Sequence, residues 1–366
     1  MERFLPTDPK IHIYGRTLHK SPLPLFWTAS GIEFMTDATT CYLDLECGYE
    51  SFEQWIRIEI DDFTMIRMVL PKGRNRICVF HDLAAGCKRK VNLWKEVQAF
   101  GPDPEAYLLI HGVELEGNLL ELPEKKVKLE FVGDSITSGE GLAGAPSMGE
   151  DWAPMIFSCK EHYGMLTARA LKADLHIVSQ SGWGVCAGWD NNPASIIPPY
   201  YHQVCGILQG ERNRALGAGE ENDFSWQPDA VMVNLGTNDC GAFDTPAFTD
   251  PQTGIAYKME RMEDGTLSPA SLDRFTGAVY DFLKTLRKYN SKAKILWLYG
   301  MIGTELSPYI QETVDRFRKE TGDEEVYFLE LPQIQPEWEG AHHHPGVIHH
   351  RKAADVLIGR LEKLLQ

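Results

Sequence analysis

The chain has 366 residues and a net charge of −16, from 36 basic and 52 acidic side chains. This length is typical of two domains, and it allows a core that needs no disulfide or metal. The negative charge repels phosphate backbones and anionic lipids, which argues against nucleic acid and membranes as partners.

The N-terminal segment and the cysteines indicate a compartment. Residues 1–9 contain no apolar stretch of the length that a signal peptide requires. No run approaches the length of a membrane span. The eight cysteines are scattered and form no Cys-x-x-Cys pair, which indicates free thiols in a reducing environment. The sequence therefore predicts a cytoplasmic protein.

Residues 1–125 predict an all-β domain. Short segments that alternate apolar and polar residues, such as 41–47 and 55–60, are separated by turn residues. No long helical period interrupts them. The pattern favours a sandwich or jelly roll. The charged stretch 122–126, which contains a proline, is the predicted linker to a second domain.

From residue 126 to residue 366 the pattern changes to strands that alternate with helices. We expect strands at 127–132, 175–180, 230–235, 295–299 and 326–331. Ser-Pro pairs at 268–269 and 307–308 are typical of helix starts. This alternation predicts a doubly wound α/β domain, with a parallel sheet covered by helices on both faces.

Four candidate residues follow strands of this predicted sheet. Ser135 follows the first strand, Gly182 the second, Asn238 the third and His344 the fifth. Because the carboxyl ends of parallel strands meet at one rim, we expect these residues to converge on one crevice. Taken alone, each motif also fits a helix cap or a tight turn. Together they supply a serine nucleophile, its base and donors for an oxyanion.

The residues of the motifs indicate which class of hydrolase this is. Ser135 is not part of a Gly-x-Ser-x-Gly elbow, which excludes the α/β-hydrolases. The blocks Gly133-Asp134-Ser135-Ile136-Thr137, Gly182, Gly236-Thr237-Asn238-Asp239 and His344-Pro345 instead resemble the four blocks of the SGNH (GDSL-type) hydrolases, which have a flavodoxin-like sheet. The resemblance implies that Ser135 is the nucleophile and His344 the base. It also implies an oxyanion hole made by the N–H groups of Ser135 and Gly182 and by the Asn238 side chain.

The β-rich front half adds a subfamily to this resemblance. A jelly-roll domain in front of such a hydrolase is similar to carbohydrate esterase family 2. That resemblance implies a carbohydrate O-acetylesterase, which removes acetyl groups from plant xylo- or manno-oligosaccharides through an acetyl-enzyme. We expect neither cofactor nor metal, because the histidine run 342–344 lacks the spacing of a metal site. The acidic composition is compatible with a homo-oligomer.

One position departs from the wider family. An aspartate usually stands three residues before the base, but Ala341 occupies that position here. Some members of carbohydrate esterase family 2 resemble this sequence and use a Ser-His dyad, in which a backbone carbonyl accepts from the base. We therefore expect a carbonyl within 338–342 to accept a hydrogen bond from His344 Nδ1.

Substrate contacts and alternative functions complete the expectations. Trp183 and Trp338 lie next to the motifs, and we expect their flat faces to bind sugar, with core packing as the competing interpretation. One alternative is another ester hydrolase, of the thioesterase or lysophospholipase type, which needs an acyl-chain tunnel. The long polar and aromatic loops argue against a tunnel. The second alternative is a catalytically inactive sugar-binding protein.

Overall fold

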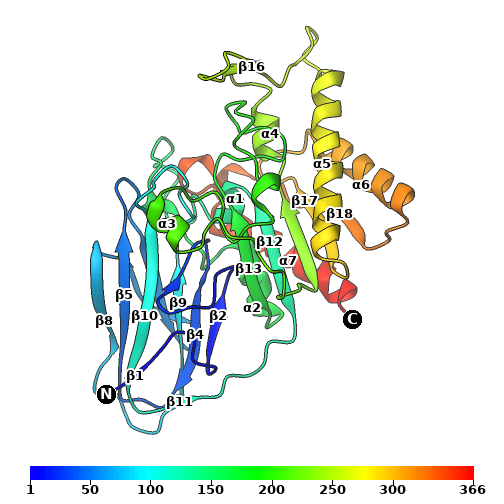
Figure 1. Ribbon diagram of the computed structural model, residues 1–366. Coiled ribbons are helices and arrows are strands. Elements are labelled where there is room, and N and C mark those ends of the chain that lie inside the picture. Colours follow the sequence, from blue (N-terminus) through cyan, green and yellow to red (C-terminus); the bar gives the residue numbers. More distant parts are fainter.

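The N-terminal part of the molecule consists of antiparallel sheets. The computed structural model describes residues 1–366 (Figure 1). The strands of this part are β1 (Glu2–Phe4), β2 (Ile11–Tyr14), β3 (Leu23–Pro24), β4 (Gly31–Thr36), β5 (Thr40–Gly48), β6 (Trp55–Ile60), β7 (Phe63–Val69), β8 (Gly73–Phe80), β9 (Arg89–Lys95), β10 (Tyr107–Glu116) and β11 (Leu119–Leu120). One sheet has the order β1-β10-β5-β8 and the other the order β11-β4-β9-β6-β7.

Alternation along the strands explains this arrangement. In β5, Cys41, Leu43, Leu45 and Cys47 are buried, as the period of two predicts. They share one core with residues of the other sheet, such as Phe34 of β4, as expected for two sheets packed face to face. The predicted antiparallel front half is confirmed, while the jelly-roll topology stays a prediction.

The C-terminal part is built on a five-stranded parallel sheet. Its elements are β12 (Lys128–Gly133), α1 (Ser135–Ser138), α2 (Tyr163–Ala170), β13 (Asp174–Ser179), α3 (Glu211–Ala215), β14 (Ala230–Asn234), α4 (Thr237–Gly241), β15 (Phe248–Thr249), β16 (Ala256–Tyr257), α5 (Pro269–Tyr289), β17 (Lys294–Tyr299), α6 (Ser307–Thr321), β18 (Val326–Glu330) and α7 (Val347–Leu364). Short 3₁₀ turns lie at Pro154–Ile156, Pro198–Tyr200, Pro336–Trp338 and Ala341–His343. Each of the five predicted strands matches an observed strand, and its ends differ from the observed ends by no more than one residue.

The strand order β13-β12-β14-β17-β18 makes this a doubly wound sheet. The chain steps outward from β12 to β13 and then crosses to β14 on the other side, so the order reverses beside β12. Ligands of open α/β sheets bind at the carboxyl ends of strands where the order reverses. The loops after β12, β13 and β14 therefore mark the expected position of a site.

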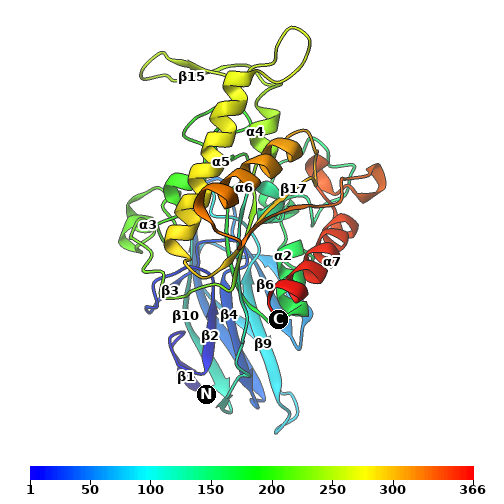
Figure 2. The ribbon, with the colours of Figure 1, turned by 90° about the vertical axis from the view of Figure 1, so that its right-hand side faces the viewer.

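Helices cover both faces of this sheet (Figure 2). Within β12, Phe131 belongs to the core shared with α2 and α7. The next residue, Val132, belongs to the core shared with α5 and α6. Successive side chains of a strand point to opposite faces, so a wholly apolar strand requires a layer on each side. None of the helices is long and apolar enough to cross a bilayer.

Buried polar contacts join the two parts of the molecule. Arg16, between β2 and β3, donates to Glu130 of β12 at 3.0 Å. Arg57 of β6 donates to Glu96 at 2.6 Å and to Ser158 at 2.6 Å. The predicted domain boundary between residues 125 and 126 falls in the segment that links β11 to β12. Besides that linker, buried contacts thus join the N-terminal part to β12 and to the loop that carries Ser158.

Candidate active site

Ser135 is held at the first position of α1, directly after β12. The Asp134 side chain caps this short helix by accepting from Ile136 N at 3.0 Å. A Cβ at Gly133 would lie 2.2 Å from Thr137 Oγ1, so the turn closes only with glycine there. The serine is 5% exposed, and its Oγ lies 2.8 Å from His344 Nε2. This is the contact that a base needs in order to take the hydroxyl proton.

His344 is oriented by a backbone carbonyl, as the missing aspartate predicts. The His342 carbonyl oxygen lies 2.5 Å from His344 Nδ1. Because a carbonyl can only accept, Nδ1 carries the proton and Nε2 is free to accept from the serine. Neither Glu337 nor Glu339 takes this place, and Glu339 instead lies 3.9 Å from His343.

Donors for an oxyanion come from the loops after β13 and β14. Gly182 has a φ of +79°, and its N–H has no partner within the protein. The Asn238 side chain donates to the Trp183 carbonyl at 2.9 Å, which fixes its amide and leaves a second N–H free. The Ser135 N–H, at the first helical position, has no intrahelical acceptor. These three donors can stabilise a negative oxygen formed at Ser135.

Asp239 holds the oxyanion loop in place. Its carboxylate accepts from the N–H groups of Val185, Cys186 and Ala187, at 2.9, 2.8 and 3.0 Å. Burial raises the pKa of Asp239, and these backbone donors oppose the rise. A Cβ at Gly184 would lie 2.4 Å from Asp239 Oδ2, so the loop passes directly over the carboxylate. The aspartate thereby ties the loop that carries Gly182 to the helix that carries Asn238.

The four predicted residues line one cavity of about 530 Å³. Its lining consists of Ser135, Glu140, Trp152, Ser181, Gly182, Trp189, Asn238, His342 and His344. The sequence-based expectation that Ser135, Gly182, Asn238 and His344 converge therefore agrees with the structure. Five further lining residues lie outside the α-helices and strands, and the sequence analysis predicted no role for their side chains in this cavity.

The two tryptophans expected to bind sugar do not line this cavity. The Trp183 ring packs against Tyr200, with 5.4 Å between centroids. The Trp338 ring lies 5.7 Å from His349 and under the Lys352 ammonium. Trp152 and Trp189 occupy the lining instead, 37% and 56% exposed. Proximity to the motifs in sequence did not place Trp183 and Trp338 in this cavity, because both side chains pack against other residues of the domain.

Loops of the N-terminal part contribute to the cavity through two sets of contacts. Trp152 packs edge-on against Phe52 and Phe100, with centroids 5.2 and 5.9 Å apart. Gln98 Oε1 accepts from the backbone N–H of Ser181 at 2.8 Å, immediately before Gly182. The N-terminal part therefore supports one wall of the cavity and the loop that carries an oxyanion donor.

Glu140 is the buried charge of the site, and the motif analysis missed it. It is 1% exposed and contacts both His342 and Ser181. Glu140, His342 and His344 have ligand-type atoms within 4.8 Å of one another. By residue type this group could hold a metal ion, but His342 Nδ1 is engaged by the carboxylate and His344 Nδ1 by a carbonyl. The only sequence signal for Glu140 was its position between two glycines.

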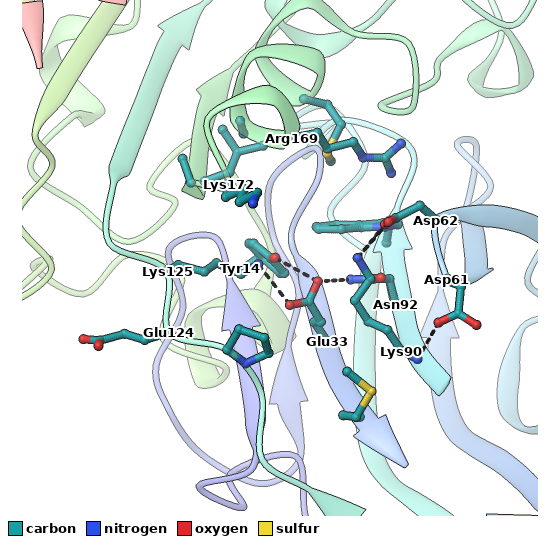
Figure 3. A pocket seen from close by; sticks show the side chains of 17 residues that line it. Tyr14, Glu33, Asp61, Asp62, Lys90, Asn92, Glu124, Lys125, Arg169 and Lys172 are labelled. Atoms are coloured by element: carbon teal, nitrogen blue, oxygen red, sulfur yellow. Dashed lines mark hydrogen bonds and ion pairs between the residues drawn. The ribbon is translucent and has the colours of Figure 1, made fainter. Parts of the chain in front are cut away.

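A second cavity, of about 640 Å³, lies between the antiparallel sheets and α2 (Figure 3). Some of its charged side chains pair with one another. Lys125 contacts Glu33 at 2.9 Å, and Lys90 contacts Asp62 at 2.7 Å. This cavity shares no residue with the one around Ser135 and contains no nucleophile beside a base. The chemistry is therefore assigned to the cavity around Ser135.

Comparison with known proteins gives several relatives that cover nearly the whole chain. No family model matches the sequence. The structure of an acetyl xylan esterase (Est2A) from the rumen bacterium Butyrivibrio proteoclasticus is 42% identical, with a TM-score of 0.95 over 97% of this chain and 95% of that one. A family two carbohydrate esterase from Clostridium thermocellum, in complex with cellohexaose, shares the fold at 24% identity, with a TM-score of 0.79 over 97% of this chain and 99% of that one.

Among curated proteins, the chain is 25% identical over 347 residues to the cellulase/esterase CelE of Acetivibrio thermocellus. The match covers 93% of this chain but only 37% of that protein. The chain thus spans well under two thirds of the length of this relative, and similarity extends to one part of it.

Proposed function

Because the chain belongs to carbohydrate esterase family 2, we propose that it removes acetyl groups from acetylated plant oligosaccharides, namely xylo- or manno-oligosaccharides. The observation that carries the proposal is the 2.8 Å contact between Ser135 Oγ and His344 Nε2, beside the donors of Gly182 and Asn238. A nucleophile, its base and oxyanion donors in one cavity are the requirements of acyl transfer. The chemistry draws on no cofactor.

The reaction proceeds through an acetyl-enzyme. His344 Nε2 takes the hydroxyl proton as Ser135 Oγ attacks the acetyl carbonyl carbon. The negative oxygen is stabilised by the N–H groups of Ser135 and Gly182 and by the Asn238 amide. The bond to the sugar oxygen then breaks, and that oxygen takes the proton from His344. Water attacks the acetyl-enzyme with help from the same base, which releases acetate and restores Ser135.

The base works as half of a Ser-His dyad. The His342 carbonyl that accepts from His344 Nδ1 is neutral, so it stabilises the imidazolium less than a carboxylate in direct contact would. It nevertheless fixes the tautomer, which is the larger part of what a triad aspartate does. The dyad is therefore sufficient for the proposed chemistry.

The lining of the cavity supports a sugar rather than a long acyl chain. Trp152 and Trp189 are its only large apolar side chains, and both are open to solvent. Flat aromatic faces suit the apolar faces of sugar rings. A thioesterase or lysophospholipase would require an apolar wall along the acyl chain, and the remaining lining residues are polar or glycine.

Acetate release from a panel of acetylated xylo- and manno-oligosaccharides tests the proposal. We expect release from at least one of these classes, and acetate to be the preferred acyl group in a series of nitrophenyl esters. A preference for octanoate would favour the lipid-directed alternative. Sugar binding without release would favour the inactive binding protein.

Asn238→Ala should lower kcat by about 10²- to 10³-fold, the cost of removing one oxyanion donor. KM should change little, because the amide acts mainly on charge that develops in the transition state. Steady-state kinetics with nitrophenyl acetate measures both constants. Because Asn238 also holds the Trp183 carbonyl, the melting temperature of the variant is the control. A large rise in KM with unchanged kcat would contradict the assigned role.

A further inference from the structure

We infer that Glu140 is the positioning carboxylate of this active site, which holds the base His344 and the Gly182 loop in one arrangement through His342 and Ser181. The inference rests on the proposed function, since it concerns the same hydrolytic site. The usual aspartate is replaced by Ala341, so the site would otherwise have no negative charge beside its base.

The backbone around Glu140 brings it into the site. Glu140 follows α1, between Gly139 at φ +76° and Gly141 at φ +82°. A Cβ at Gly139 would lie 2.1 Å from the Ser158 carbonyl oxygen. A Cβ at Gly141 would lie 2.5 Å from the Ala341 carbonyl oxygen and 2.7 Å from His344 Cβ. Both flanking positions therefore require glycine. The close backbone approach that these glycines permit places the buried Glu140 beside the loop that carries His344.

Each oxygen of the carboxylate holds a different part of the machinery. Oε1 lies 2.6 Å from His342 Nδ1, and the His342 carbonyl is the acceptor for His344 Nδ1. Oε2 accepts from Ser181 Oγ at 2.6 Å, and Ser181 directly precedes the oxyanion donor Gly182. One buried side chain thus joins the element that orients the base to the element that binds the oxyanion.

His342 needs this partner because its backbone is in the left-handed region. Its φ and ψ are 52° and 38°, which cost a residue with a Cβ about 1 kcal/mol or more. The contact with Glu140 holds the ring, and with it the carbonyl that faces His344. The rings of His342 and His344 are parallel within 6°, with centroids 5.4 Å apart. Loss of Glu140 would free His342 to leave this conformation and turn its carbonyl away.

The charge of Glu140 also acts directly on the base. Burial disfavours the carboxylate, but His344, His342 and Ser181 outweigh burial and hold the pKa of Glu140 below its usual value. The hydrogen bond with Glu140 raises the pKa of His342. Glu140 Oε1 lies 3.8 Å from His344 Nδ1, too far for a hydrogen bond but close enough to stabilise an imidazolium. Asp134, the remaining acid near Glu140, is fully buried, and burial raises its pKa to about 8. The charge of Glu150 also raises the pKa of His342.

Two substitutions should shift the pH dependence of the reactivity of Ser135 in opposite directions. Glu140→Gln keeps the shape but removes a negative charge that lies 3.8 Å from His344 Nδ1, so the acidic limb should move to lower pH. His342→Gly removes the ring that shares the Glu140 carboxylate with His344, tolerates the positive φ and leaves Glu140 facing His344 alone, so the acidic limb should move to higher pH. A residue that served only the fold would produce neither shift.

These shifts can be measured without a sugar substrate. The measurement is the rate at which a fluorophosphonate labels Ser135, as a function of pH. Glu140→Gln should also lower kcat for nitrophenyl acetate by about 10- to 100-fold, less than the roughly 10⁴-fold lost with a directly bonded triad aspartate. KM should stay within about threefold, since Glu140 does not act by ground-state binding. Ser181→Ala is the matched control, because it removes a hydrogen bond from Glu140 and leaves the charge.

The outcomes are separable from those of the proposed function. Opposite shifts for Glu140→Gln and His342→Gly, with the limb unmoved in Ser181→Ala, support the inference. Labelling profiles like that of the wild type in both variants overturn it. Should Glu140→Gln not fold, the direction of the His342→Gly shift alone decides. Failure to release acetate from the oligosaccharide panel would overturn the proposed substrate. The labelling profiles would still test the role of Glu140, because they need no sugar.

Discussion

Ser135→Ala is expected to lower kcat for acetyl-ester hydrolysis by at least about 10³-fold. The hydroxyl that His344 activates at 2.8 Å is the only nucleophile beside the base. Without it no acetyl-enzyme forms, and what remains is catalysis by a bound water and the oxyanion donors. Nitrophenyl acetate hydrolysis measures the loss, and fluorophosphonate labelling should disappear with it.

Ser138→Ala provides the matched control for this prediction. Ser138 lies in the same short helix, is fully buried and donates to Ser179 Oγ at 2.9 Å. Its replacement costs a hydrogen bond of about 1 kcal/mol but touches neither the base nor the oxyanion donors. Activity should therefore survive in Ser138→Ala. Comparable activity in both variants would show that Ser135 is not the nucleophile.

The sequence predicted the sheet and the four motif residues because both depend on regular spacing. A fully apolar strand such as β12 can only be buried on two faces, and Phe131 and Val132 indeed belong to different cores. Once five such strands alternate with helices, the rule that strand ends share one rim brings Ser135, Gly182, Asn238 and His344 together. Ala341 in place of the aspartate, together with the resemblance to members of carbohydrate esterase family 2 that lack it, likewise predicted the carbonyl that faces His344.

The parts of the site that escaped prediction lie in loops, which have no period. Gln98 reaches the N–H of Ser181 from 83 residues away. Trp152 is held by Phe52 and Phe100 from loops of the N-terminal part. Such contacts follow from how the two parts dock, and docking leaves no pattern in one sequence. Glu140 had a local signal, because glycines at positive φ on both sides indicate a close backbone approach, but its partners are 41 and 202 residues away.

The docking itself depends on a buried ion cluster around Glu96. The side chain is fully buried and accepts from Arg57 at 2.6 Å and from Arg67 at 2.9 Å. Arg57 also donates to Ser158, and Arg67 to the Phe157 carbonyl at 2.9 Å. Burial disfavours the carboxylate, but Arg57, Cys159 and Arg67 together hold the pKa of Glu96 below its usual value. One carboxylate thereby pairs with two arginines that bind the segment next to Trp152.

Glu96→Ala should lower the free energy of unfolding by about 3–5 kcal/mol, because Arg57 is left as a buried charge without its main partner. Urea unfolding at pH 7 measures the loss. Glu114→Ala is the matched control: Glu114 also contacts two arginines, but those arginines are exposed, so about 1 kcal/mol or less is expected. Since folding lowers the pKa of Glu96, its contribution is present above the ordinary glutamate pKa and is lost as the pH falls. The difference between wild type and Glu96→Ala should therefore narrow below about pH 4. A difference that matches Glu114→Ala at pH 7 would mean that the cluster does not stabilise the junction, and that Trp152 is held by the aromatic contacts alone.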